Sequence, residues 1–351
     1  MTGDGATLRT ARLAAGVSLK EMAALTFYSE SLLSRVERGL RTLTPEIRFR
    51  YEQVLGDAVY RRELLTGAAG AVVPLALSSH ILKSFQEPGT AQTSLDDWRG
   101  KAAAYGREYM RVPAAELQTR LAADLIDLQR QSESPALWGV AAYLLNTYGK
   151  TMPGSERALG WYGAALSASD RSGDTAVRVW TRGRVALQLG YEGSDPAQAR
   201  VLARQALALS DKPSTGKINA HTAIAHAAAL DGNTAECEEQ LTLAWRTFDK
   251  VNDSEQISDH AIPGWRIATS ASLAYARLGS GKTIRAGQTA AETRPGELPR
   301  FGVHTDLHAA LMMVKAGDRA GGVAHARQSM ASLRGKASLS LQLLLSEIER
   351  G

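Results

Sequence analysis

The sequence predicts an all-α protein, and its composition and patterning support that class. Aromatic residues make up only 6% of the 351 residues, alanine is abundant, and no stretch shows a sustained alternation of β-branched residues. Hydrophobic residues account for 44% and charged residues for 22%, which is ordinary for a globular protein. A chain of this length can form more than one domain with a substantial buried core.

The first two helices are predicted from the signals at their ends. Apolar and basic residues from Leu8 to Ala15 indicate a helix that ends at Gly16. Ser18 followed three residues later by Glu21 forms a capping box, in which each side chain binds the other residue's backbone N–H. This pair predicts a second helix from Leu19 to about Leu25.

Two further helices follow closely. Ser29 can cap a helix from Glu30 to Arg38, and Gly39 supplies the left-handed residue that ends it. Thr44-Pro45-Glu46 places a capping residue before a proline at the first helical position, which predicts a helix that ends at Gly56.

Helices this short are not stable alone in water, so they must share a core. We therefore predict a compact bundle of four or five helices that contains a helix-turn-helix. The apolar positions able to form its core are Leu8, Val17, Met22, Ala23, Leu25, Leu33, Val36, Ile47, Tyr51, Val54 and Leu55.

The run LRTARLAAGVSLKEMAALTFYSESLLSRVERG resembles the phage-repressor-type (Cro or XRE) helix-turn-helix, especially the versions in actinobacterial regulators. Their recognition helix ends in a serine, a basic residue, an apolar residue, a glutamate and then a glycine. The stretch from Ser34 to Gly39 carries that ending here. Phe27 replaces the family's turn glycine, which leaves the form of the turn open. The resemblance covers roughly residues 6–62.

The resemblance implies that the second helix of the motif lies in the major groove of DNA. Arg35 would then bind guanine O6 and N7, and Glu30 would accept a hydrogen bond from cytosine N4. The implied base contacts are Glu30, Ser31, Ser34 and Arg35. The implied phosphate contacts, which set register and affinity rather than specificity, are Ser18, Lys20, Arg38, Arg41 and Thr42.

The alternative for these polar residues is an ordinary solvated helix face, on which Arg35 pairs with Glu30 or Glu37. Overall charge does not decide between the two. Residues 1–62 hold ten Lys and Arg against seven Asp and Glu, a net charge of +3, and the whole chain carries +5 with a pI of about 9.3. This mildly basic balance permits binding to nucleic acid without establishing it.

The rest of the chain is predicted to be a series of helix pairs. Short turns separate the helices at residues 152–154, 192–196, 212–214, 231–233, 279–281 and 316–318. Glycines expected to end comparable helices, at positions 149, 190, 232, 279 and 317, are spaced by 41, 42, 47 and 38 residues. Periods of this size indicate an α-solenoid, and the pattern resembles degenerate tetratricopeptide repeats.

These patterns predict three parts of the chain. Residues 1–62 form the helix-turn-helix domain, 63–97 an apolar linker or helix, and 98–351 the tetratricopeptide-like domain, which would dimerise and bind an effector. Such arrays have a concave binding surface. Aromatic and basic residues that could line it are Trp138, Tyr143, Tyr148, Trp161, Trp180, Arg184, Trp265, Arg266 and Tyr275. Packing is the alternative role for each, and a purely dimerising scaffold is the alternative for the array.

The compartment is inferred from cysteine use and from the absence of an export signal. The single cysteine, Cys237, excludes an internal disulfide framework and favours a reducing cytoplasm. We expect no signal peptide in residues 1–20, which have no apolar centre. Residues 64–82 lack Asp, Glu, Lys and Arg and follow Arg61-Arg62, as in a twin-arginine signal or a membrane span. Pro74 and several glycines interrupt them, so we expect a buried helix and linker.

Two other motifs carry no expected chemistry. Gly279-Ser280-Gly281-Lys282-Thr283 resembles the end of a phosphate-binding loop, but Ala276 stands where its first glycine would fall, and a turn between helices is expected. His304 and His308 share the spacing of zinc-binding histidines, but Thr305 replaces the required glutamate. We therefore expect no metal, no cofactor and no enzyme activity.

The sequence thus predicts a cytoplasmic, homodimeric transcriptional regulator that binds an inverted repeat in double-stranded DNA. A small molecule or peptide bound in the repeat domain would control it. Two other readings stay open: an adaptor that uses its helix-turn-helix to bind a partner protein, and a phosphate-binding enzyme that uses Gly281-Lys282-Thr283.

Overall fold

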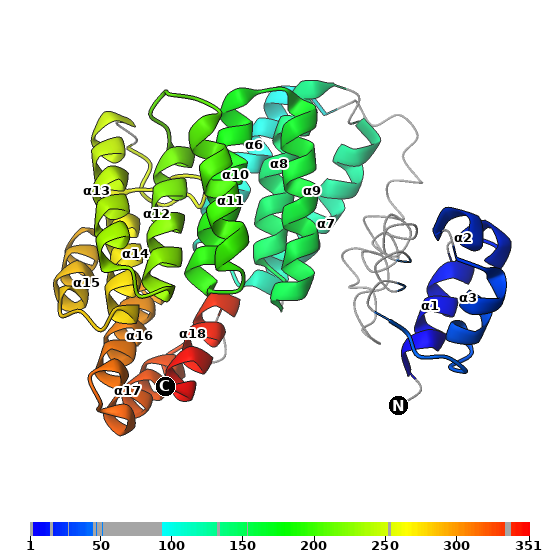
Figure 1. The fold of residues 1–351 in the computed structure, drawn as a ribbon. Helices are drawn as coiled ribbons and strands as arrows, with labels where there is room; N and C mark the ends of the chain where they lie inside the picture. Colours follow the sequence, from blue (N-terminus) through cyan, green and yellow to red (C-terminus); the bar gives the residue numbers. More distant parts are fainter. Residues whose placement is uncertain are drawn as a thin grey trace. The chain divides into compact units, whose positions relative to one another are not determined.

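The described helices form two compact units, Met1–Glu87 and Pro88–Gly351, and each is considered by itself. The described part of the chain is all-α and contains no strand, as the sequence predicted (Figure 1). A computed structural model describes residues 3–14, 17–26, 28–44, 47, 51, 93–131, 134–152, 154–251, 254–333 and 338–351.

The N-terminal unit contains three described helices, α1 (Gly3–Ala14), α2 (Leu19–Thr26) and α3 (Glu30–Glu37). The capping box before α2 is confirmed: Ser18 N–H donates to Glu21 Oε2 at 2.8 Å, and Glu21 N–H donates to Ser18 Oγ at 3.1 Å. At the start of α3, Leu32 N–H donates to Ser29 Oγ at 3.3 Å, so the predicted serine cap is also confirmed.

Helix α3 ends one residue earlier than predicted because Arg38 is its cap. Gly39 adopts a left-handed φ of 70°, and its N–H donates to the carbonyl of Val36 at 3.0 Å. The N–H of Leu40 donates to the carbonyl of Arg35 at 2.8 Å. These two bonds satisfy carbonyls that the helix end would leave without donors, which explains the abrupt stop.

The predicted core of this unit is largely present. Its buried side chains are Met22, Leu33, Val36, Ile47 and Tyr51, with Leu8, Val17 and Ala23 packed against them. The remaining predictions for this region lie outside the described residues: Val54, Leu55, the side chain of Leu25, the turn residue Phe27, the helix end at Gly56 and the apolar stretch 64–82.

The C-terminal unit begins with two helices, α6 (Leu95–Tyr109) and α7 (Ala114–Gln131). Helix α6 starts three residues before the predicted boundary at 98, because Ser94 caps it by accepting from Asp97 N–H at 3.1 Å. Five helix pairs follow: α8 (Pro135–Lys150) with α9 (Ser155–Ser172), α10 (Thr175–Glu192) with α11 (Pro196–Ala208), α12 (Thr215–Leu230) with α13 (Thr234–Val251), α14 (Gly264–Arg277) with α15 (Lys282–Thr293), and α16 (Arg300–Lys315) with α17 (Arg319–Ala331).

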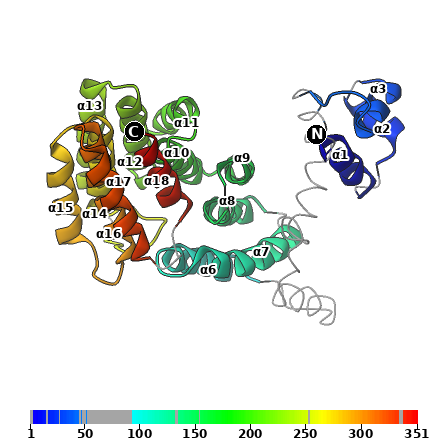
Figure 2. The ribbon, with the colours of Figure 1, turned by 90° about the horizontal axis from the view of Figure 1, so that it is seen from below.

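The pairs stack through their first helices, so that α8, α10, α12, α14 and α16 contact one another in succession. The final helix, α18 (Leu339–Arg350), folds back onto α10, α16 and α17 (Figure 2). No helix in the described segments is both long and apolar enough to cross a membrane.

The six predicted turns separate these helices, but two of the predicted helix-ending glycines were assigned wrongly. Gly232, Gly279 and Gly317 have left-handed φ angles of 73°, 64° and 99° and follow helix ends as expected. Gly149 and Gly190 instead lie inside the last turns of α8 and α10. Their role is close packing between helices, which a spacing argument cannot distinguish from a helix end.

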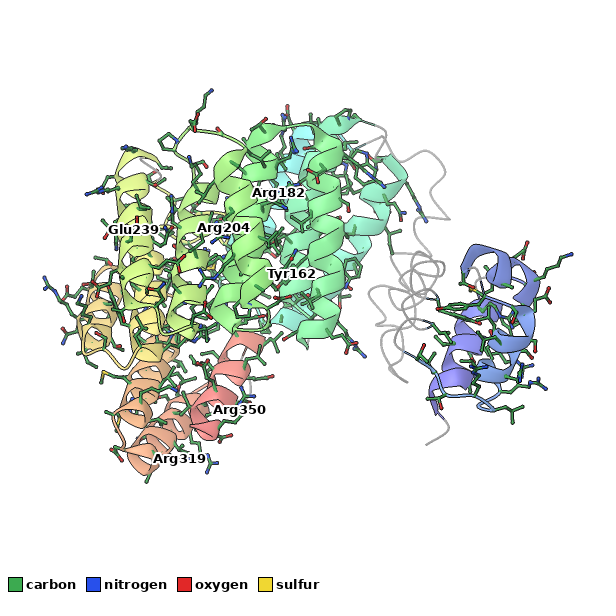
Figure 3. All side chains as sticks on the ribbon, viewed as in Figure 1. Tyr162, Arg182, Arg204, Glu239, Arg319 and Arg350 are labelled. Atoms are coloured by element: carbon green, nitrogen blue, oxygen red, sulfur yellow. The ribbon has the colours of Figure 1, made fainter. Side chains whose placement is uncertain are left out.

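The absence of a side chain at Gly149, and at a further glycine, Gly183, lets neighbouring helices approach closely. A Cβ at Gly149 would lie 2.8 Å from the ring of Tyr162 on α9, which is labelled in Figure 3. A Cβ at Gly183 on α10 would lie 2.0 Å from the carbonyl oxygen of Gly216, at the start of α12. The second contact is with backbone, which cannot move without shifting a helix.

The segment between α13 and α14 crosses to the first helices of the unit. Asp259 N–H donates to the carbonyl of Gly106 on α6 at 2.8 Å. Trp180 Nε1, on α10, donates to the carbonyl of His260 at 3.0 Å, and Arg266 Nη1, on α14, donates to that of Ala261 at 2.7 Å. The first two bonds hold residues 254–263 against α6 and α10, which lie far away in the sequence.

We predict that Gly183→Ala lowers the free energy of unfolding by about 1–3 kcal/mol, because the new methyl group overlaps the Gly216 carbonyl. The measurement is denaturant unfolding followed by tryptophan fluorescence, since all six tryptophans lie in this unit. Gly163→Ala is the matched control: this exposed position on α9 has nothing within 4 Å of a Cβ. It should gain roughly 0.5–1 kcal/mol from helix propensity. Equal shifts in both variants would contradict the packing argument.

Candidate nucleic-acid interface and a cationic pocket

The predicted DNA contacts lie on the surface of the N-terminal unit. Ser34 is half-buried, and the other eight, Glu30, Ser31, Arg35, Ser18, Lys20, Arg38, Arg41 and Thr42, are exposed. Leu33 and Val36, on the opposite side of α3, are fully buried, as predicted. Helix α3 therefore presents a polar face to solvent and an apolar face to the core.

Arg35 lies along the surface of α3 towards the helix N-terminus. Its Nη2 donates to Ser31 Oγ at 3.1 Å and its Nε to the Ser31 carbonyl at 3.3 Å. The guanidinium therefore sits beside the N-terminal residues of the helix, which in this motif face base edges. The suggested pairing of Arg35 with Glu37 is wrong, because Glu37 is buried and binds Arg12.

The Arg12–Glu37 ion pair clamps α3 onto α1. Arg12 Nε and Nη2 donate to the two carboxylate oxygens of Glu37 at 2.6 and 2.8 Å, and both side chains are buried. Arg12 Nη1 also donates to the carbonyl of Val17 at 2.9 Å, and Tyr51 OH donates to Glu37 Oε1 at 2.9 Å. The Glu37 hydrogen bond raises the pKa of Arg12 further above its usual value. Such a bidentate pair fixes geometry as well as adding energy.

Close approach of the backbone completes the clamp. A Cβ at Gly5, on α1, would lie 2.0 Å from the carbonyl oxygen of Val36 on α3. The two helices are thus held at backbone contact near one point and by the Arg12–Glu37 pair near another. This arrangement sets the direction in which the polar face of α3 points.

The C-terminal unit contains a pocket of about 660 Å³, counting the open space at its mouth. It lies between the first helices of successive pairs, the segment 254–263 and the start of α18. The residues that line it are Tyr109, Lys150, Arg184, Leu187, Gln188, Tyr191, Asp259, Ile262, Trp265, Arg266, Thr269, Ser270, Arg300, Phe301, His304, Ser338 and Ser340.

The carboxylate of Asp259 is the electrostatic centre of this pocket. Its Oδ1 accepts hydrogen bonds from Lys150 Nζ at 2.5 Å, Arg184 Nη2 at 2.7 Å and Arg266 Nη2 at 3.4 Å. Burial alone would raise the pKa of Asp259, but the three cations together lower it well below its usual value. Asp259 is therefore ionised although only 1% of the residue is exposed.

Three of the nine predicted groove residues, Arg184, Trp265 and Arg266, line this pocket, and the other six do not. Tyr143 and Trp180 pack against each other as tilted rings with centroids 4.0 Å apart, and both contact the ring of His260. The other four pack in pairs: Tyr148 with Trp161 at 4.5 Å, Arg171 over Trp138 at 4.5 Å, and Lys282 over Tyr275 at 5.7 Å. For these six the packing alternative describes the structure.

Sequence reasoning missed Lys150, Asp259 and Arg300 in this pocket. One signal was available for Lys150, which is the only charged residue in the 16-residue helix α8. A lone charge in an apolar helix indicates a buried ion pair. Asp259 has no such signal, because it lies in an irregular segment whose position depends on distant helices.

The two motifs without expected chemistry, and the single cysteine Cys237, have structural surroundings that account for them. Gly279–Gly281 forms the turn between α14 and α15, Thr283 Oγ1 donates to the carbonyl of Ser280 at 2.8 Å, and Lys282 pairs with Glu238. Burial, with Glu238 and Glu236, raises the pKa of the Cys237 thiol to about 12. His304 and His308 both contact Tyr191 OH, at 2.7 and 3.1 Å, and no group of three or more metal-binding side chains occurs in the described segments.

Comparison with known proteins identifies the N-terminal part of the chain. The family described as "Helix-turn-helix domain" matches residues 5–50, which include α2, α3 and all but the first two residues of α1. No curated protein and no solved structure matches the chain. The protein therefore has an N-terminal helix-turn-helix domain, followed by an all-helical region of paired helices. Such a domain indicates DNA binding and transcriptional regulation.

We predict that Glu37→Ala destabilises the N-terminal unit by about 3–5 kcal/mol, because it leaves the Arg12 charge buried without a carboxylate. Hydrogen exchange of the α3 amides in the full chain measures this loss. Tyr51→Phe is the control, since it removes only one hydrogen bond to Glu37 and should cost about 1 kcal/mol. The clamp would be refuted by α3 amides that exchange no faster in Glu37→Ala than in Tyr51→Phe.

We also predict that the protein loses stability as the pH falls from 7 to 5. Burial, with Arg300, Arg266 and Lys150 nearby, lowers the pKa of His304 to about 3. A histidine whose folded pKa lies below its unfolded value of about 6.5 binds protons mainly when unfolded, so its contribution is lost as the pH falls through that value. Between pH 6.5 and the folded pKa of His304, the free energy of unfolding falls by about 1.4 kcal/mol for each pH unit that the pH drops.

Urea unfolding at a series of pH values measures this dependence. His304→Asn cannot take up the proton and should show a shallower loss of stability between pH 7 and 5 than the wild type. An equal slope in both proteins would show that His304 does not contribute.

Proposed function

We propose that the protein is a homodimeric, cytoplasmic transcriptional regulator that reads DNA sequence with α3 and responds to an effector bound in its C-terminal unit. The observation that best supports DNA reading is the two-sided character of α3. Its inner side is held by the buried Arg12–Glu37 pair, and its outer side presents Glu30, Ser31 and Arg35. A rigidly held helix with an exposed polar N-terminal half is suited to base recognition.

The proposed contacts divide into two groups. Arg35 and Glu30 would bind base edges in the major groove, with Ser31 and Ser34 on the same face. The proposed phosphate contacts lie at the start of α2, at Ser18 and Lys20, and directly after α3, where Arg38, Arg41 and Thr42 follow. A homodimer would place two copies of α3 on half-sites about one helical turn apart, roughly 34–36 Å. The proposal includes no catalytic activity.

The second candidate function is that of an adaptor that binds a partner protein. Leu40, directly after α3, is 68% exposed, and Leu13 on α1 is 59% exposed. Exposed apolar side chains on the surface of this unit would suit a protein partner better than a phosphate backbone. The two functions differ in their dependence on salt, because DNA binding releases condensed counterions and weakens steeply as salt rises.

We predict that Arg35→Ala reduces affinity for the preferred DNA site by the equivalent of about 1–3 kcal/mol and relaxes sequence preference at one position. Arg41→Ala should weaken binding to all sequences equally and reduce the slope of log K against log salt by about 1. The measurement is binding to genomic fragments, including the protein's own upstream region, over a salt series.

Arg204→Ala is the charge-matched control, because Arg204 is exposed on α11 in the other unit (Figure 3). It should bind DNA like the wild type. If the wild type prefers no fragment even at low salt, the adaptor function is favoured over DNA reading. If Arg35→Ala and Arg204→Ala behave alike, Arg35 does not read bases.

A further inference from the structure

The pocket of the C-terminal unit holds more positive than negative charge. Its cationic lining side chains are Lys150, Arg184, Arg266 and Arg300, and Asp259 is the carboxylate among the lining residues. A neighbouring carboxylate, Glu192, uses its Oε1 to accept from Gln188 Nε2 and Ser340 Oγ. Even with Glu192 included, this part of the unit has two more positive than negative side chains.

The excess charge is buried, which makes it costly. The side chains of Lys150 and Arg184 are each 4% exposed, and a single carboxylate oxygen, Oδ1 of Asp259, serves both. A buried charge is expensive unless a counter-charge compensates it. Burial is the larger cause and the nearby charge of Arg184 the second: together they hold the pKa of Lys150 well below its usual value and lower the pKa of Arg266 to about 10. Burial and the neighbouring cations together thus disfavour the charged forms of Lys150 and Arg266 by more than Asp259 offsets.

One hydrogen-bond donor among these cations is unused. Arg184 Nε is buried and has no hydrogen-bond partner among the described residues. Arg266 is oriented by three carbonyls, since its Nη1 donates to those of Ser258, Asp259 and Ala261. The guanidinium groups are therefore held in place before any ligand arrives, and this reduces the entropy cost of binding.

Aromatic side chains form the rest of the wall beside these cations. Lys150 Nζ lies 4.2 Å from the ring centroid of Tyr109, and the Arg300 guanidinium carbon lies 5.6 Å from it. Arg300 also covers the ring of Phe301 at 5.1 Å, and that ring packs edge-on against Trp265 at 5.1 Å. A ligand that fits this wall has an apolar body as well as a negative charge.

We propose that this pocket binds a small molecule that carries a carboxylate or phosphate group on an apolar body. The anionic group would lie among Lys150, Arg184, Arg266 and Arg300, where it offsets their excess charge and accepts from Arg184. The apolar body would pack on the aromatic wall. This inference rests on the proposed function in one respect, because it identifies that molecule as the effector of the regulator.

Binding to the full-length protein is tested with phenyl phosphate and phenylacetate, with benzyl alcohol as the neutral control and sodium chloride holding the ionic strength constant. We expect one or both anions to raise the unfolding temperature in a saturable way and to bind in calorimetry, while benzyl alcohol does neither. The anion that binds more tightly identifies the acidic group as a phosphate or a carboxylate.

Two variants separate a ligand site from a structural ion cluster. Lys150→Met removes one buried cation and leaves Asp259 paired with Arg184 and Arg266. If the pocket is a ligand site, we expect Lys150→Met to lose at least tenfold in anion affinity. The unfolding temperature of this variant without ligand should be unchanged or higher. Arg319→Gln loses the same charge on the exposed start of α17 (Figure 3) and should bind like the wild type. If Lys150→Met does not fold, Arg300→Gln, which is only partly buried, takes its place.

The proposal is overturned if neither anion stabilises the wild type more than benzyl alcohol does. It is also overturned if Lys150→Met melts at a lower temperature and binds the anions as tightly as the wild type. DNA binding, measured in the same buffer with and without the anion, is a separate readout. Loss of DNA binding in every condition contradicts the proposed regulator and leaves the result on anion binding standing.

Discussion

The Asp259 carboxylate connects three helices of the C-terminal unit at one buried point. It joins Lys150 at the end of α8, Arg184 in the middle of α10 and Arg266 near the start of α14. These partners lie 109, 75 and 7 residues away in the sequence. Because stacked helix pairs contact mainly their neighbours, a link from α8 to α14 ties together parts that the stacking alone would leave independent.

The Arg12–Glu37 pair and the cluster around Asp259 differ in their charge balance. In the N-terminal unit, Arg12 and Glu37 match one for one, and further hydrogen bonds from Tyr51 OH and to the Val17 carbonyl complete the pair. Such a pair has a structural purpose, which here is to orient α3. Around Asp259 several cations share one carboxylate. An arrangement that leaves charge uncompensated is poor for stability alone, so it is better explained by a binding role.

Much of the fold could be predicted because its signals are local. The Ser18–Glu21 capping box, the Ser29 cap and Gly39 set the ends of the N-terminal helices through bonds that span three to five residues. Apolar spacing likewise placed Leu33 and Val36 in the core. Gly149 and Gly190 were misassigned because a glycine that ends a helix and one that admits a neighbouring helix look the same in a sequence.

The sequence by itself determined the all-α class, the capped starts of α2 and α3 and the polar face of α3, because capping and periodicity act over a few residues. Only the tertiary structure decided which charges meet. Glu37 pairs with Arg12, which lies 25 residues away in the sequence, and Asp259 pairs with Lys150, which lies 109 residues away. The pocket exists because residues 254–263 return to α6 and α10, and no local pattern specifies that path. Long-range electrostatic partners depend on how the helices stack, which is a property of the whole unit.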